Sequence, residues 1–216
     1  MIDVKTLQTI LNNLITSSMR EVRDDRDLLD SFSPNQFKSK LKLINYIDKL
    51  NVLNKDSEIV IMGGWYGSIL IPAFHNKVKK ITLIDKDKKV ISRAKYNLWS
   101  NIKNVEFIAD DVFRTYRNQF SNTDLFINTS CEHMKPMREW GPSPEYKTPW
   151  WTRVKNNCHF VFQSNNMFDI FTHINCVNNF EEFEKQLPDN AKVLFRDTIE
   201  DDRGTRFMLG GKICNE

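Results

Sequence analysis

The sequence predicts an α/β fold in which a doubly wound, mostly parallel sheet is covered by helices on both faces. From Glu58 onward, short apolar runs recur with potentially helical segments between them. The runs are nearly continuous rather than alternating, as is typical of parallel strands buried on both faces. Two further runs near the C-terminus are close enough to form an antiparallel hairpin that closes the sheet.

Two helices are expected before the first strand, within an N-terminal helical segment spanning residues 1–52. Their apolar residues recur at helical spacing, in the sets Leu7, Leu11, Leu14, Ile15 and Phe37, Leu41, Ile44, Ile47. Ser33 suits the N-cap of the second helix, and Pro34 suits its first position.

A core of residues 57–213 contains the predicted strands. They are EIVIM (58–62), KKITLID (79–85), VEFIAD (105–110), DLFINT (124–129), HFVFQS (159–164), AKVLFRDTI (191–199) and TRFMLGGKI (205–213). Residues 88–100 and 178–187 read as helices between strands. The first of these places Val90, Ala94 and Leu98 on one face, which fits a right-handed β-helix-β crossover. Residues 134–156 contain four prolines and a glycine, so we expect an insertion or lid-like loop there.

Composition favours a single globular domain of 216 residues. The apolar fraction is 40% and the net charge only +3, which gives no support for a nucleic-acid partner. No apolar stretch is long enough to span a membrane and the N-terminus lacks a signal-peptide core, so we expect a cytoplasmic protein. The four cysteines occur singly, which predicts reduced thiols and neither a zinc site nor a disulfide framework.

The ends of the first three strands carry residues suited to a nucleotide-like ligand. Gly63, Gly64 and Gly67 allow a tight turn and close backbone approach, although an ordinary turn would also explain them. Asp85 follows 18 residues after Gly67, where a carboxylate can accept both hydroxyls of a ribose. Asp111 could accept the exocyclic amine of an adenine, or cap a helix over VFRTY.

This order of glycine turn, acidic strand ends and closing hairpin resembles the class I S-adenosylmethionine-dependent methyltransferases, over residues 57–213. The resemblance implies a seven-stranded sheet with reversed strand order at the hairpin, and S-adenosylmethionine across strands one to four. The cofactor-binding residues it implies are Gly63, Gly64, Trp65, Gly67, Asp85, Lys86, Asp110, Asp111, Val112, Asn128 and Ser130. INTSCEHM, followed by QSNN and HINC, also resembles a phage and bacterial branch of unknown acceptor.

Several motifs depart from this family or from others. Ile61 stands where the family commonly has an acidic residue, and Trp65 replaces the middle glycine; Trp65 and Tyr66 could equally be core aromatics. The turn GGWYG lacks the G-x-G-x-x-G of nicotinamide-binding dehydrogenases, and no G-K-[ST] of a P-loop follows it. Only Asn128 matches the Asn/Asp-Pro-Pro-aromatic motif of methyltransferases acting on nucleobase amines.

Methyl transfer requires positioning and, for some acceptors, proton removal, so no enzyme nucleophile is needed. Cys131 therefore reads as a packing residue, while Glu132 and His133 are the catalytic candidates. We expect Asn165, Asn166 and His173 to bind the acceptor, although asparagines there could simply be turn residues. No metal ligand set is expected.

The sequence thus favours a methyltransferase that uses S-adenosylmethionine and acts on an unknown, small-molecule acceptor. Two alternatives remain open. An aminocarboxypropyl transferase would use the same cofactor, and Trp65 in the turn motivates it. A non-catalytic binding protein would retain the fold without turnover.

Overall fold

A computed structural model of the chain describes residues 9–12, 26–112, 120–139 and 149–215. Within these residues, the strands form one sheet in the order β3-β2-β1-β4-β5-β7-β6. The strands are β1 (Glu58–Met62), β2 (Lys80–Asp85), β3 (Val105–Ala109), β4 (Leu125–Asn128), β5 (Cys158–Asn165), β6 (Ala191–Asp201) and β7 (Gly204–Ile213). β1 to β5 run parallel, and β7 pairs antiparallel with both β5 and β6. The predicted fold class and the reversed order at the hairpin are confirmed.

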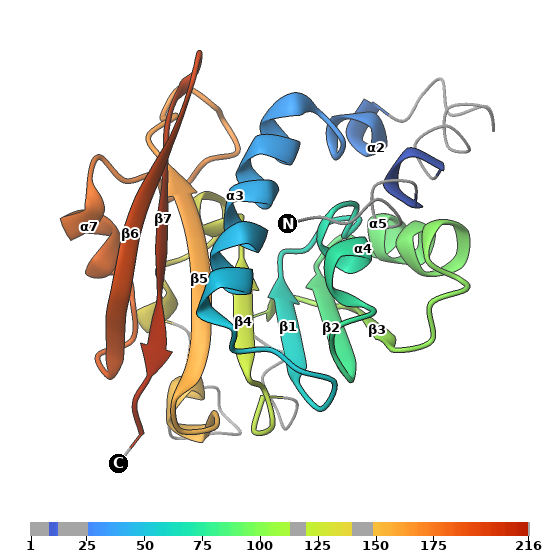
Figure 1. The fold of residues 1–216 in the computed structure, drawn as a ribbon. Coiled ribbons are helices and arrows are strands. Elements are labelled where there is room, and N and C mark those ends of the chain that lie inside the picture. Colours follow the sequence, from blue (N-terminus) through green and yellow to red (C-terminus); the bar gives the residue numbers. More distant parts are fainter. Residues whose placement is uncertain (1–8, 13–25, 113–119, 140–148, 216) are drawn as a thin grey trace.

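Short helices connect these strands and cover the sheet (Figure 1). They are α2 (Arg26–Asp30), α3 (Pro34–Leu50), α4 (Leu70–Phe74), α5 (Lys88–Arg93) and α7 (Phe180–Glu184). A π-helical turn at Ala94–Leu98 extends α5, and 3-10 turns occupy Cys131–His133, Met137–Glu139 and Trp150–Arg153. None of the helices in the described ranges is long and apolar enough to cross a membrane.

The second predicted N-terminal helix is confirmed as α3, which lies across one face of the sheet in Figure 1. It begins after Ser33 with Pro34 at its first turn, and Ile44 and Ile47 are buried as predicted. In the first predicted helix, residues 9–12 are helical, but the predicted face is wrong at Leu11. Leu11 is 45% exposed, because the neighbouring Ile10 points into the core instead. The other predicted apolar positions of that helix, Leu7, Leu14 and Ile15, lie outside the described residues.

Both faces of the sheet are buried, which explains the near-continuous apolar strands. One face packs against α3 and α4 through residues such as Ile44 and Phe74, and the other carries Phe126 and Phe160. Met137 and Trp151, from the proline-rich segment, pack into that second cluster. The described parts of this segment thus cover the sheet, and residues 140–148 lie outside the described ranges.

The sheet order creates a switch point that positions the site. The chain proceeds from β1 outward through β2 to β3, and then returns to the other side of β1 with β4. Connections that leave in opposite directions open a crevice outside the carboxyl ends of β1 and β4. Any ligand bound by the predicted residues would therefore lie at this edge.

Candidate functional site

A cavity of about 850 Å³ opens at the carboxyl ends of β1, β2 and β4. A volume of this size suits a cofactor or a drug-sized ligand. The predicted residues that line it are Gly63, Gly64, Trp65, Gly67, Asp85, Lys86, Asp111, Val112, Ser130, Glu132, His133 and His173. Residues far apart in the sequence are thus brought around one space.

The turn after β1 is held by the acidic residue after β2. The backbone N–H of Trp65 donates to Asp85 Oδ2 at 2.9 Å, and that of Asp87 donates to Asp85 Oδ1 at 3.0 Å. The N–H of Gly64 donates to the carbonyl of Ile84 at 3.1 Å. Each carboxylate oxygen can accept more than one hydrogen bond, so Asp85 keeps acceptor capacity toward the cavity.

Backbone conformation explains why this turn is rich in glycine. Gly63 and Gly67 have φ values of 57° and 65°, a backbone conformation that residues with a Cβ atom rarely adopt. A Cβ atom at Gly67 would also lie 2.4 Å from Ile71 Cδ1. Trp65 has a φ of 49°, an uncommon conformation for a bulky residue, and its side chain lies at the cavity. The aromatic residue therefore occupies a strained position at the site.

Four predicted site residues are not among those lining the cavity. Each uses its side-chain oxygen to accept a nearby backbone N–H: Asn128 from Ser130, Asp110 from Asp111, Asn165 from Met167 and Asn166 from Thr205. Asn128 and Asn165 are completely buried. These side chains shape the loops that carry the lining residues.

Part of the wall comes from the N-terminal segment, and no sequence motif predicted this placement. The cavity is lined there by Asp27, Asp30, Ser31, Ser33, Gln36 and Lys40. The hydroxyls of Ser31 and Ser68 lie 2.6 Å apart and join the loop before α3 to the segment before α4. The N-terminal helices therefore complete the site.

A buried ion pair crosses the far end of the cavity. Arg206 Nη1, on β7, donates to Glu132 Oε1 at 3.0 Å, and the two side chains are 12% and 3% exposed. Glu132 Oε2 is buried and has no hydrogen-bond partner among the described residues. Burial and the nearby Arg206 guanidinium lower the pKa of Lys40 to about 7. Neither Lys40 nor Arg206 was predicted, since a single basic residue on a helix or strand carries no motif.

Two histidines stand beside this ion pair. The rings of His133 and His173 meet edge to face with centroids 4.6 Å apart. The Nδ1 atoms contact the carbonyls of Thr172 at 3.0 Å and Met167 at 3.1 Å, respectively. Burial lowers the pKa of His173, which favours its neutral form. The segments HINC and INTSCEHM therefore lie side by side at the cavity.

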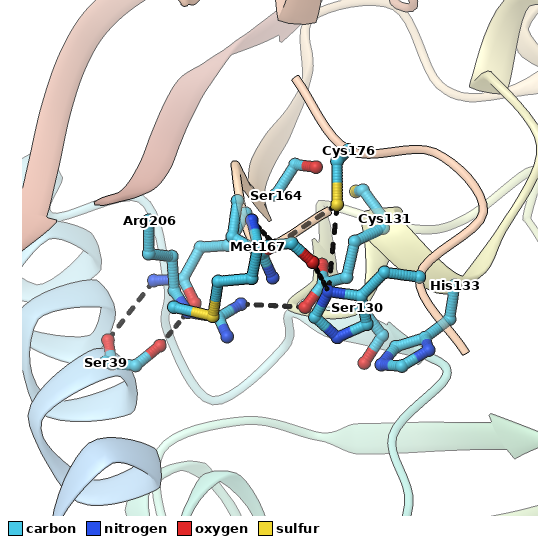
Figure 2. A network of polar contacts seen from close by, with 12 residues as sticks. Ser39, Ser130, Cys131, His133, Ser164, Met167, Cys176 and Arg206 are labelled. Carbon is cyan, nitrogen blue, oxygen red and sulfur yellow. Dashed lines mark hydrogen bonds and ion pairs between the residues drawn. The ribbon is translucent and has the colours of Figure 1, made fainter. Parts of the chain in front are cut away.

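Backbone contacts fix this arrangement. The carbonyl of Glu132 accepts the N–H groups of Ile174 and Asn175 at 2.9 and 3.0 Å. Figure 2 shows residues from three parts of the chain converging on one region: Ser130 and His133 after β4, Met167 and Cys176 after β5, and Arg206 on β7.

Cys131 does not belong to the reactive surface of this region. It is 2% exposed and is not among the residues lining the cavity. Burial, followed by the Glu132 carboxylate, raises the pKa of its thiol. A thiol that stays protonated is a poor nucleophile, which supports its interpretation as a packing residue.

Solved structures with the same fold include several methyltransferases. The N-methyltransferase NodS from Bradyrhizobium japonicum, in complex with S-adenosyl-L-homocysteine, is 14% identical with a TM-score of 0.63, covering 97% of this chain and 98% of its own. The tRNA (m1A58) methyltransferase TrmI from Aquifex aeolicus is 14% identical with a TM-score of 0.55, covering 83% and 70%. An rRNA methylase from Streptococcus thermophilus is 11% identical with a TM-score of 0.53, covering 85% and 98%.

No protein-family model and no curated protein matches the chain. The structural likeness shows that the chain has the class I methyltransferase fold, as its resemblance implied.

Proposed function

We propose that the chain binds S-adenosylmethionine and transfers its methyl group to an acceptor held beside His133 and His173. The observation that carries this proposal is the grouping of the glycine turn, Asp85 and Asp111 around one cavity at the switch point of the sheet. That is where doubly wound folds bind nucleotide-like ligands. The NodS structure, which contains S-adenosyl-L-homocysteine, supports the choice of cofactor.

The residues at this edge fit such a cofactor chemically. Asp85 retains acceptor capacity for ribose hydroxyls, and Asp111 lines the same cavity for an adenine amine. The turn of Gly63 and Gly64 would face the methionine moiety, with Ser130 beside it: the Ser130 hydroxyl lies 3.3 Å from the Gly63 carbonyl. When bound, the cofactor supplies an activated methyl group.

The opposite end of the cavity supplies groups for an acceptor. His133 is exposed and lines the cavity, so its imidazole can contact an acceptor bound there. Lys40, with a pKa of about 7, can also be neutral there and accept a proton. The ion pair of Arg206 and Glu132 forms part of the cavity wall at the same end. These groups favour a small polar acceptor, which they could orient by hydrogen bonds.

Calorimetry with S-adenosylmethionine tests the cofactor assignment. One molecule should bind per chain, and absence of binding by the folded protein would overturn the proposal. Incubation with cofactor labelled in the methyl group, together with either a metabolite extract or total RNA, then identifies the acceptor class. We expect label to enter small molecules. His133→Ala should bind cofactor like the wild type and turn over more slowly.

A second candidate, aminocarboxypropyl transfer, is favoured by Trp65. Its strained backbone and its place on the cavity wall would alter how the methionine tail is held. Product analysis separates the two reactions. S-adenosylhomocysteine supports methyl transfer, whereas methylthioadenosine would show that the other group is transferred.

A further inference from the structure

We propose that Glu132, His133 and His173 form a binding site for a divalent transition-metal ion at the acceptor end of the cavity. A potential ligand atom from each of the three lies within 4.8 Å of the others, and all three residues line the cavity. Among the described residues, no other group of this kind comes together. The inference goes beyond the proposed reaction, because it concerns the chain without its cofactor.

The hydrogen bonds of the two histidines point to a metal. Each Nδ1 lies 3.0 to 3.1 Å from a backbone carbonyl, which can only accept, so each Nδ1 carries the proton. In the neutral rings this leaves a lone pair on both Nε2 atoms. Metal-binding histidines are held in this way, with one nitrogen donating to a carbonyl and the other facing the ion.

Glu132 provides the third ligand through its remaining oxygen. Arg206 donates to Oε1, while Oε2 is buried and has no hydrogen-bond partner in the part of the chain that the structure describes. An unpaired buried carboxylate oxygen costs free energy, which a bound cation would offset. The ion pair with Arg206 also fixes the orientation of the carboxylate.

Nearby charges select the kind of ion. Arg206, and Lys40 when it is protonated, line the cavity and repel cations. A hard ion such as Mg²⁺, which depends on several oxygen ligands and their charge, is therefore disfavoured. Zn²⁺ and similar ions bind well to imidazole nitrogen with a single carboxylate. Three protein ligands leave a position open for an oxygen or nitrogen of the acceptor.

Only small movements would be needed to close the site. Ligand atoms about 2.1 Å from a tetrahedral zinc ion lie about 3.4 Å from one another. His133 is exposed, so its ring can shift about its Nδ1 contact with Thr172 and bring Nε2 toward the other two ligands. The backbone hydrogen bonds from Ile174 and Asn175 to Glu132 keep the two ligand-bearing loops together meanwhile.

The test is calorimetric titration of the chelator-treated, cofactor-free full chain with ZnCl2, repeated with CoCl2 and followed by absorption. We expect one ion per chain, a cobalt spectrum without an intense thiolate band, and no competition from excess MgCl2. His133→Ala and His173→Ala should each weaken binding at least about tenfold. His159→Ala removes a histidine on β5 outside the cavity lining and should bind zinc like the wild type.

Several results would overturn the metal site. These are no zinc binding by the wild type, unchanged affinity in both histidine variants with native circular dichroism, or loss of binding in His159→Ala. Cys176→Ser is a further control, since its sulfur lies 3.7 Å from His173 Nδ1. Loss of zinc in that variant would indicate a thiolate site instead. Binding of S-adenosylmethionine is measured separately, so failure of either proposal leaves the other standing.

Discussion

The backbone N–H of Trp65 donates to the carboxylate of Asp85 at 2.9 Å, so the end of β2 holds the turn after β1. The two parts of the proposed cofactor site are therefore coupled. A change at Asp85 affects both the ribose contact and the shape of the turn.

Asp85→Ala should weaken binding of S-adenosylmethionine by roughly 1 to 3 kcal/mol, because buried hydrogen bonds are lost. Calorimetry measures this change. Asp56→Ala, at an exposed aspartate before β1 and so at the other edge of the sheet, should leave the affinity unchanged. Equal affinities in the Asp85 variant and the wild type would show that the ribose lies elsewhere.

Arg206→Ala should destabilise the folded chain by about 3 to 5 kcal/mol, because it leaves the Glu132 carboxylate buried without its partner. Urea unfolding measures the loss. Adding Glu132→Gln to this variant should restore much of the stability, since no charge is then buried.

The ion pair between Lys79 and Glu58 provides a matched control. Lys79 is 63% exposed, and Lys79→Ala should leave the free energy of unfolding nearly unchanged. A similar loss of stability in Arg206→Ala and Lys79→Ala would show that burial does not determine how much these ion pairs contribute.

Lys40 should make stability depend on pH. Its pKa is lowered from 10.5 to about 7 in the folded chain, so between these values the unfolded chain binds the additional proton. The free energy of unfolding should therefore rise with pH across this range through Lys40. In Lys40→Met this rise in the free energy of unfolding should be smaller. The variant should be stabilised most, relative to the wild type, at about pH 7 and below. Denaturant titrations at several pH values measure how the free energy of unfolding changes with pH. Lys49→Met, at an exposed lysine on the same helix, should show the same change with pH as the wild type.

Cys131 should resist alkylation in the native protein. Burial raises the pKa of its thiol and also blocks access of the reagent. Iodoacetamide followed by peptide mass analysis should show faster labelling of Cys214, which is only partly buried, and labelling of all four cysteines after denaturation. Rapid native labelling of Cys131 would return it to the list of nucleophile candidates.

The sequence predicted the sheet well because its strands are short, mostly apolar runs separated by turn or helical segments. It also brought the glycine turn, Asp85 and Asp111 to one edge, since the carboxyl ends of parallel strands meet there. The roles of Asn128 and Asn165 could not be read in this way. An asparagine at a strand end can contact a ligand or accept a backbone N–H, and only the folded loop decides between them.

Lys40 and Arg206 escaped prediction for a different reason. Their importance comes from lying near Glu132, which is 92 residues from Lys40 (132 − 40) and 74 residues from Arg206 (206 − 132) in the sequence, and no local pattern reports such a contact. Leu11 illustrates the same limit on a smaller scale: periodicity predicts a helix, but tertiary packing chose Ile10 as the buried residue.

The hydroxyl contact between Ser31 and Ser68 means that occupation of the cavity and docking of the N-terminal segment are thermodynamically linked. A ligand that touches both walls would slow local opening of α2 and α3, which hydrogen exchange can follow amide by amide. Screening for unknown acceptors could use this slowing as a readout, because it requires neither turnover nor a labelled compound.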